Sequence, residues 1–172
     1  GFIDNVAKPI AGATSQTNGG GLLVRERCAT TTSNVTVAIA NSVFQGNRTE
    51  PSTNSSNGAG MSLLTRGNVT ITDTRVVGNT IVSQVTPVNN RGGGISVESA
   101  TSVRIERTEI AGNAADRGAG VRLIVQDPAL QAPVDPMEVQ IVNSTISGNV
   151  VATPVTAVAG IGPYGNVSVE VK

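Results

Sequence analysis

The chain of 172 residues carries twelve basic and twelve acidic side chains and has no net charge at neutral pH. Balanced charge does not favour binding to nucleic acid or to an anionic membrane surface. With two Phe, one Tyr and no Trp, the chain also has few aromatic side chains on which bases or sugars could stack. No histidine is present, which excludes histidine-based acid–base catalysis and histidine metal ligands. We therefore expect no nucleic-acid partner.

The apolar composition is dominated by β-branched residues, with 25 Val and 12 Ile against 6 Leu, beside 20 Gly. Such a composition predicts an all-β chain with many turns. No apolar run is long enough to cross a bilayer, so we expect no membrane insertion by this segment. The single Cys28 cannot form a disulfide within the chain. A buried thiol is the preferred interpretation, and pairing with another part of a parent protein is the alternative.

Along the chain, a first motif of the form V-x-I-x-x-[ST]-x-apolar-x-G-N occurs four times, at 37–47, 69–79, 103–113 and 139–149. Residues 2–5 match its end, with Asp4 in place of the Gly, and residues 167–172 match its beginning. The alternation of apolar and other residues at its start predicts a strand. The next apolar residue falls out of step with this alternation, which predicts a bend before the [ST] position and a second short strand after it. The Gly-Asn pair predicts a tight or left-handed turn.

A second motif, small-Gly-apolar-x-apolar, alternates strictly with the first one. It occurs at 20–24, 59–63, 93–97 and 119–123, and in degenerate form at 159–163. We expect the second residue of each copy to be a corner glycine, where any side chain would clash. These glycines are Gly21, Gly60, Gly94, Gly120 and Gly160.

A repeat of two or three short strands cannot bury its apolar face alone, but stacked repeats can. The G-N asparagines follow one another at steps of 42, 32, 34 and 36 residues, and the extra length falls in Pro-, Ser- and Asn-rich connections. The sequence therefore predicts an all-β, right-handed parallel β-helix (solenoid) of about five coils with variable loops. We expect residues 1–172 to be a single β-helix segment, excerpted from a longer solenoid.

The alternation of GGGL with NSVFQGN, and of GGGI with NSTISGN, resembles the right-handed parallel β-helix repeats of pectin-lyase-like proteins. It is most similar to the polymorphic outer-membrane-protein type found in surface adhesins and autotransporter passengers. The resemblance extends from Phe2 to Lys172 and implies a secreted or cell-surface location. It does not imply one activity, because adhesins and polysaccharide-cleaving enzymes share this scaffold. Right-handedness rests on this resemblance and on the general preference of parallel crossovers.

The asparagine of the first motif recurs at the same turn of every coil. A line of amides could bind sugar hydroxyls, but a position that recurs in every coil favours an internal ladder in which stacked amides hydrogen-bond from coil to coil. The sequence predicts this structural Asn ladder at Asn5, Asn47, Asn79, Asn113 and Asn149.

The bend position holds Asn41, Asp73, Arg107 and Asn143, and this mixed chemistry predicts an outward or partly buried residue. Asp73 and Arg107 fall on neighbouring coils, where a surface ion pair is preferred over a catalytic pair. A second group of charges is expected to form one solvated face of mixed charge. Its members are Glu98, Arg104, Glu106, Arg107 and Glu109.

Acidic residues are scattered, with no closely spaced pair of the kind that glycoside hydrolases use. We therefore predict that the chain is not an enzyme and holds no cofactor and no metal. The predicted function is a non-enzymatic structural or adhesive β-helix segment of a secreted or cell-surface protein, and an extracellular fibre is one form that such a protein takes. The alternative is a carbohydrate-active module, of polysaccharide lyase or hydrolase type, that binds glycans in a groove.

Expected partners are further coils of the same parent protein, or end-to-end copies of this chain. Glycans or host and cell-surface proteins would be contacted through the variable loops. If the source is eukaryotic, Asn34 and Asn54 are the expected glycosylation acceptors among the N-x-[ST] sequons, because both fall in predicted loops.

Overall fold

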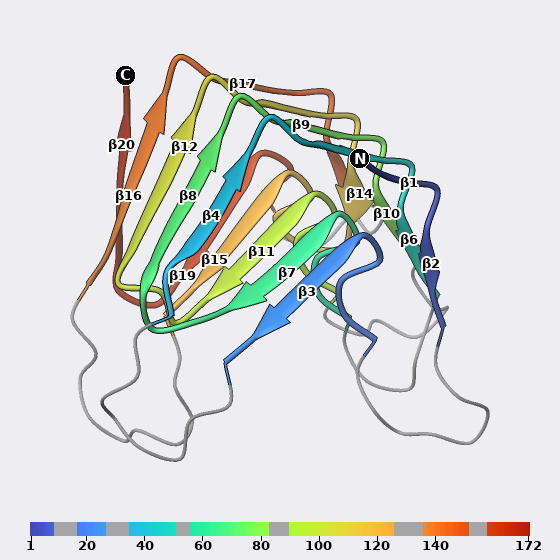
Figure 1. Cartoon of the computed structure of the whole chain (residues 1–172), viewed down its shortest axis with the longest axis horizontal. Coiled ribbons are helices and arrows are strands. Elements are labelled where there is room, and N and C mark those ends of the chain that lie inside the picture. Colours follow the sequence, from blue (N-terminus) through green and yellow to red (C-terminus); the bar gives the residue numbers. More distant parts are fainter. Residues whose placement is uncertain (9–16, 27–34, 51–55, 83–89, 126–135, 152–157) are drawn as a thin grey trace.

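Five coils stack on one another, and each coil contributes one strand to each of four parallel sheets (Figure 1). The computed structural model describes residues 1–8, 17–26, 35–50, 56–82, 90–125, 136–151 and 158–172. All regular secondary structure in these residues is strand. The predicted parallel β-helix of about five coils is thus confirmed. Cys28, Asn34 and Asn54 lie outside the described residues.

We number the sheets by the order in which a coil visits them. Sheet 1 consists of β1 (Phe2–Ile3), β5 (Val43–Gln45), β9 (Arg75–Val77), β13 (Glu109–Ala111) and β17 (Thr145–Ser147). Sheet 2 consists of β2 (Val6–Ala7), β6 (Arg48–Thr49), β10 (Thr80–Ile81), β14 (Ala114–Ala115) and β18 (Val150–Val151).

The two longer sheets complete the coil. Sheet 3 consists of β3 (Leu22–Arg25), β7 (Met61–Leu64), β11 (Ile95–Glu98), β15 (Val121–Ile124) and β19 (Ile161–Tyr164). Sheet 4 consists of β4 (Val37–Ala40), β8 (Asn68–Thr72), β12 (Ser102–Glu106), β16 (Met137–Val142) and β20 (Val167–Val171).

The register between coils places like residues on like. In sheet 4, Ile39 pairs with Ile71, Ile71 with Ile105 and Ile105 with Ile141. The final coil continues the column with Val171, which pairs with Ile141. Each of these side chains points inward, and the period-two alternation leaves its sequence neighbours on the outer face.

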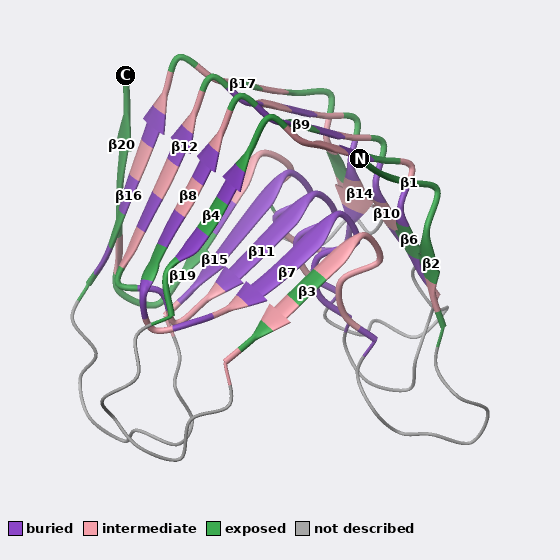
Figure 2. Cartoon of the chain, viewed as in Figure 1, coloured by how far each residue is buried: buried purple, intermediate pink, exposed green. Residues whose placement is uncertain are grey.

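The core lies between sheets 3, 4 and 1 and runs from coil to coil as one cluster. Figure 2 shows it as buried stripes along β7, β11 and β15 and alternate buried residues along β8, β12 and β16. In sheet 1, Phe2 stacks on Phe44 with ring centroids 4.8 Å apart. This distance matches the spacing between neighbouring strands, so the aromatic column follows the repeat of the sheet.

The bend between sheets 4 and 1 depends on a left-handed residue followed by a hydroxyl. The hydroxyl groups of Thr74 and Thr108 donate to the carbonyl oxygens two residues earlier, at 2.8 and 2.9 Å. These bonds close the turn and explain why the first motif keeps Ser or Thr. The left-handed residues are Asn41, Asp73, Arg107 and Asn143, all exposed, with φ of 48°, 49°, 46° and 47°.

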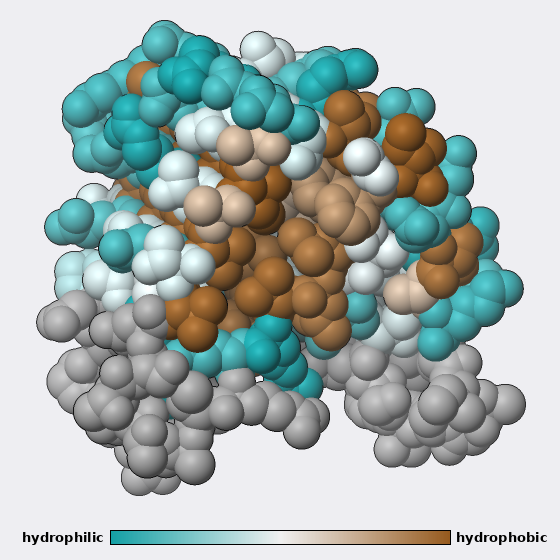
Figure 3. Space-filling model, viewed as in Figure 1, coloured by the Kyte–Doolittle hydropathy of each residue, from teal (hydrophilic) through white to brown (hydrophobic). Residues whose placement is uncertain are grey.

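Both terminal coils expose apolar side chains that central coils bury. In the first coil, Phe2 is 38% exposed whereas its sheet 1 partner Phe44 is buried, and in the last coil Val171 is exposed whereas its sheet 4 partner Ile141 is buried. Figure 3 shows apolar residues gathered between the sheets on one face of the molecule. Such ends present both unpaired strand edges and open core.

Candidate functional site

The five predicted ladder asparagines lie directly above one another, and each donates to the next. The backbone N and the Nδ2 of Asn79 both donate to Oδ1 of Asn113, each at 2.9 Å. Asn47 makes the same two bonds to Asn79, at 3.0 and 2.9 Å. The pairs Asn5–Asn47 and Asn113–Asn149 repeat the arrangement.

From the second coil onward, the Nδ2 of each ladder residue also donates back one coil, to a backbone carbonyl oxygen. Asn79 Nδ2 donates to the Phe44 carbonyl oxygen at 2.9 Å, and Asn113 Nδ2 donates to the Val76 carbonyl oxygen at 2.9 Å. The amide of Asn79 therefore donates twice and accepts twice, which exhausts its hydrogen-bonding capacity. A side chain that is wholly buried and fully bonded has nothing left to offer a sugar.

The predicted corner glycines pack against this ladder. A Cβ on Gly94 would lie 2.7 Å from the Gly120 carbonyl oxygen and 3.0 Å from Asn113 Nδ2. Gly21, Gly60 and Gly120 have equivalent neighbours, whereas the nearest atom to a Cβ on Gly160 is 3.9 Å away. The close approach of backbone and ladder, and not the sign of φ, therefore requires glycine at the first four of these positions but not at Gly160.

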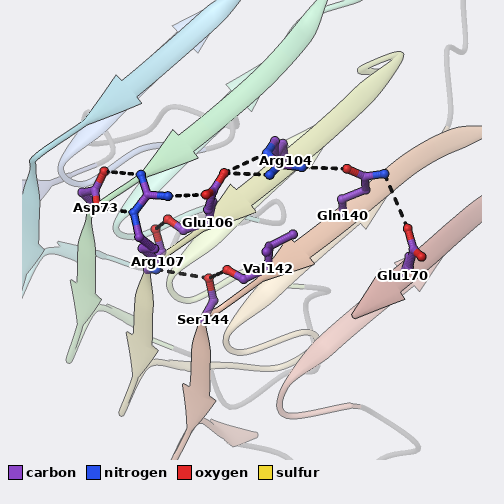
Figure 4. Close-up of polar contacts among 9 residues, drawn as sticks. Asp73, Arg104, Glu106, Arg107, Gln140, Val142, Ser144 and Glu170 are labelled. Atoms are coloured by element: carbon purple, nitrogen blue, oxygen red, sulfur yellow. Dashed lines mark hydrogen bonds and ion pairs between the residues drawn. The ribbon is translucent and has the colours of Figure 1, made fainter. Parts of the chain in front are cut away.

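A chain of polar contacts crosses the outer side of sheet 4 (Figure 4). Arg107 donates from Nε and Nη2 to the two carboxylate oxygens of Asp73, at 2.7 and 2.8 Å, and Nη1 contacts Glu106. Glu106 also accepts from Arg104 Nε at 2.9 Å, and Arg104 Nη1 donates to Gln140 at 2.8 Å. Gln140 Nε2 in turn donates to Glu170 Oε2 at 3.5 Å, so the contacts join four neighbouring coils.

This polar row has the electrostatics of a solvated surface. Hydrogen bonding to Arg107 lowers the pKa of Asp73, and hydrogen bonding to Arg104 lowers the pKa of Glu106. Hydrogen bonding to Asp73, followed by the negative charges of Asp73 and Glu106, raises the pKa of Arg107 above its already high ordinary value. Asp73, Glu106 and Arg107 thus stay charged at neutral pH, and none of these three is a proton donor or acceptor poised near neutrality.

The prediction of a single mixed-charge face was wrong. Arg104, Glu106 and Arg107 do lie together, but Glu109 belongs to sheet 1 and pairs with Arg75 at 2.7 Å. Glu98 belongs to sheet 3, where it is half-buried, and burial raises its pKa despite the opposing charges of Arg91 and Arg25. The reason is geometric, because successive strands of one coil face different directions.

A second ladder, which the sequence analysis missed, precedes sheet 3. Asn90 Oδ1 accepts from the Ser56 backbone N at 3.0 Å, and Asn90 Nδ2 donates to Asp116 Oδ2 at 2.9 Å. The next residue in each coil joins a column of parallel bridges, from Asn57 to Arg91 and from Arg91 to Arg117. The repeated signals TNG, SNG, NRG and DRG at 17–19, 56–58, 90–92 and 116–118 could have revealed both columns.

Carboxylates are not gathered into a metal site in the described part of the chain, where no group of three or more His, Cys, Asp or Glu side chains could hold an ion. Nor do the described residues include a helix long and apolar enough to span a membrane. No protein-family model, curated protein sequence or solved structure matches the chain.

Proposed function

We propose that this chain is a non-enzymatic structural or adhesive β-helix segment of a secreted or cell-surface protein. The observation that carries this proposal is that the recurring polar side chains form hydrogen bonds inside the protein. In the central coils the repeated asparagines are wholly buried and bonded to their neighbours, so they hold the coils together. Recognition then belongs to residues that differ from coil to coil. The polar row on sheet 4 and the variable connections are such places.

We further propose that the coils are right-handed and of the pectin-lyase-like type, closest to the polymorphic outer-membrane-protein repeats. The support is the repeat itself, in which a GG-apolar element alternates with an apolar-x-G-N element. Determination of the handedness by crystallography tests this assignment, and left-handed coils would contradict it.

The partners we propose are coils above and below, from the same parent protein or from another copy. The asparagine ladder has a direction, because every bond between two ladder asparagines is donated by the N-terminal residue and accepted by the C-terminal one. Asn149 therefore presents donors at one end, and Asn5 presents an acceptor at the other. Parallel strands and a polar ladder both favour head-to-tail continuation, which builds a rod and not a closed dimer.

Light scattering on the isolated chain across a concentration series tests the self-association. If copies stack, the mass grows with concentration, and this growth is abolished by Val171→Lys in the last strand or by Phe2→Lys in the first, because both residues lie in inward columns. A monodisperse monomer throughout assigns the ends to further coils of the parent protein instead.

Incubation with a panel of acidic and neutral polysaccharides tests the absence of enzymatic activity. New reducing ends or unsaturated products would overturn the proposal in favour of a carbohydrate-active module. Retention of the labelled chain on glycans or on cell surfaces, without turnover, supports an adhesive role.

A further inference from the structure

The outer side of sheet 3 departs from the expected alternation of buried and exposed residues. Ser62, Ser96 and Arg122 point away from the core in one column, yet all three are buried. Their strands β7, β11 and β15 are accordingly coloured as buried along most of their length in Figure 2. Ile124, two residues beyond Arg122, is also buried. An outward strand face that is buried is a different environment from the solvated outer side of sheet 4.

Arg122 carries a charge into this environment without a carboxylate partner among the described residues. It is 6% exposed, and its Nη1 donates to the carbonyl oxygens of Gly162 at 2.9 Å and Pro163 at 3.5 Å. Its Nε is buried without any hydrogen-bond partner, and its guanidinium lies 5.1 Å from the centre of the Tyr164 ring. A buried cation that lacks an opposite charge is costly to fold.

Two more arginines stand beside it. Arg91 and Arg117 are bridge partners on neighbouring coils, and Gly118 lies against the side chain of Arg122. The Nε of Arg91 is also buried and unpartnered. Burial, followed by the charges of Arg91 and Arg117, lowers the pKa of Arg122 to about 10, so Arg122 remains charged at neutral pH.

Three like charges held together by a rigid register repel one another unless an anion lies between them. We propose that the arginines on the outer side of sheet 3 bind a small oxyanion, sulfate or phosphate, through Arg91, Arg117 and Arg122. The planar guanidinium fork suits an oxyanion better than a halide, because it offers parallel N–H donors to two oxygen atoms. Half-buried Glu98 lies within range of the charges of Arg91 and Arg25, and Asp116 accepts from Asn90. Two carboxylates beside four arginines leave an excess of positive charge on this side of sheet 3, and this excess favours an added anion.

The side-chain Nε–H resonances of ¹⁵N-labelled arginine provide a direct test in the intact chain. We expect the Arg122 and Arg91 signals to shift saturably on addition of sodium sulfate or sodium phosphate, and not with sodium chloride at equal ionic strength. Arg122→Met assigns its own signal. Arg91→Met and Arg117→Met, which change less buried residues, should each weaken the affinity about tenfold.

Arg75→Met is the matched control, because Arg75 is exposed and paired with Glu109 on sheet 1. Sulfate stabilises proteins generally by exclusion from their surface. If thermal unfolding is followed in the same salts, an increase in the midpoint that Arg75→Met shares with the parent chain is therefore non-specific. Linear, non-saturating shifts that are equal in the parent, Arg91→Met and Arg75→Met would overturn the proposal. Saturation by trigalacturonate but not by sulfate or phosphate would also overturn it, in favour of a sugar carboxylate.

Discussion

The central coils and the terminal coils contain the same motifs in the same register but differ in what they bury. Ile71 and Ile105 are wholly buried, whereas Val171, in the same column of sheet 4, is 68% exposed. The three residues hold equivalent positions within the motif, so the difference in their exposure comes from the neighbouring coils alone. In this molecule a coil is stabilised by the coils on either side of it, and a single coil would have little stability.

The polar ladder follows the same rule. Asn79 and Asn113 have partners above and below and are fully buried, whereas Asn5 is exposed and has a partner on one side only. One residue type at one turn is thus a core residue in the middle and a surface residue at the end. Matched substitutions in the two regions measure how much each neighbouring coil contributes.

The largest difference is expected for the ladder amides. Asn79→Ala leaves the backbone N and Nδ2 of buried Asn47 without their acceptor, and should lower the free energy of unfolding by about 3–5 kcal/mol. Asn5→Ala removes bonds only at the exposed end and should cost less than about 1 kcal/mol. Urea denaturation of both variants measures the difference, and equal losses would contradict a ladder that depends on both neighbours.

A smaller difference is expected for the corner glycines. Gly94→Ala forces a Cβ to within 2.7 Å of a backbone oxygen, which should cost about 1–3 kcal/mol. Gly160→Ala meets no atom closer than 3.9 Å, and its cost should fall below about 0.5 kcal/mol. The denaturation midpoints of the two variants give the comparison. A Gly160→Ala variant as unstable as Gly94→Ala would show that the glycine is needed for some reason other than close approach.

The contrast between the outer sides of sheets 3 and 4 appears in the pH dependence of stability. Burial raises the folded-state pKa of Glu98, so its charged form destabilises the fold as pH rises through that value. Glu98→Gln should match the parent chain near about pH 4, where both side chains are neutral, and exceed it at neutral pH. Thermal midpoints across this range measure the effect. A variant that is less stable at neutral pH would show that Arg91 and Arg25 outweigh burial.

The smallest effect is expected on sheet 4. Asp73 and Arg107 are exposed, so either Asp73→Asn or Arg107→Ala should shift the thermal midpoint by ~2 °C or less, and less still in high salt. The pKa of Asp73 is lowered, so its contribution is present at neutral pH and disappears as pH falls through the folded-state value. A double-mutant thermal series would isolate the pair, and a large coupling would contradict a solvated surface.

The parts of the fold that repeat could be predicted from the sequence. The V-x-I alternation identified the inward side of sheet 4, and the recurring Gly-Asn pair located the turn between sheets 1 and 2. Such features are local, and each copy supports the others. The left-handed bend is different, since Asn, Asp and Arg all occupy it and only the hydroxyl that follows is constant.

What could not be predicted depends on contacts between residues that do not share a motif. Alternation alone places Ser96 and Glu98 on a solvated surface, yet Ser96 is buried and Glu98 is half-buried. Arg91 and Arg117 are bridge partners, but the connections that precede them differ in length, so a fixed sequence spacing does not align them. Local pattern assigns a side chain to a face, whereas the surroundings of that face are a property of the whole fold.

The register described above also determines how this molecule can change in length. Asn79 and Asn113 are 34 residues apart, and every column repeats at that step in this part of the chain. Deletion of residues 75–108 would bring β8 onto β16 with valine still facing valine and isoleucine still facing isoleucine. A deletion that joins unlike positions of two coils, for example an inward residue to an outward one, would instead interrupt the columns. The rod therefore changes length in steps of one coil. Whole coils can be duplicated or lost while the residues of the core columns remain matched.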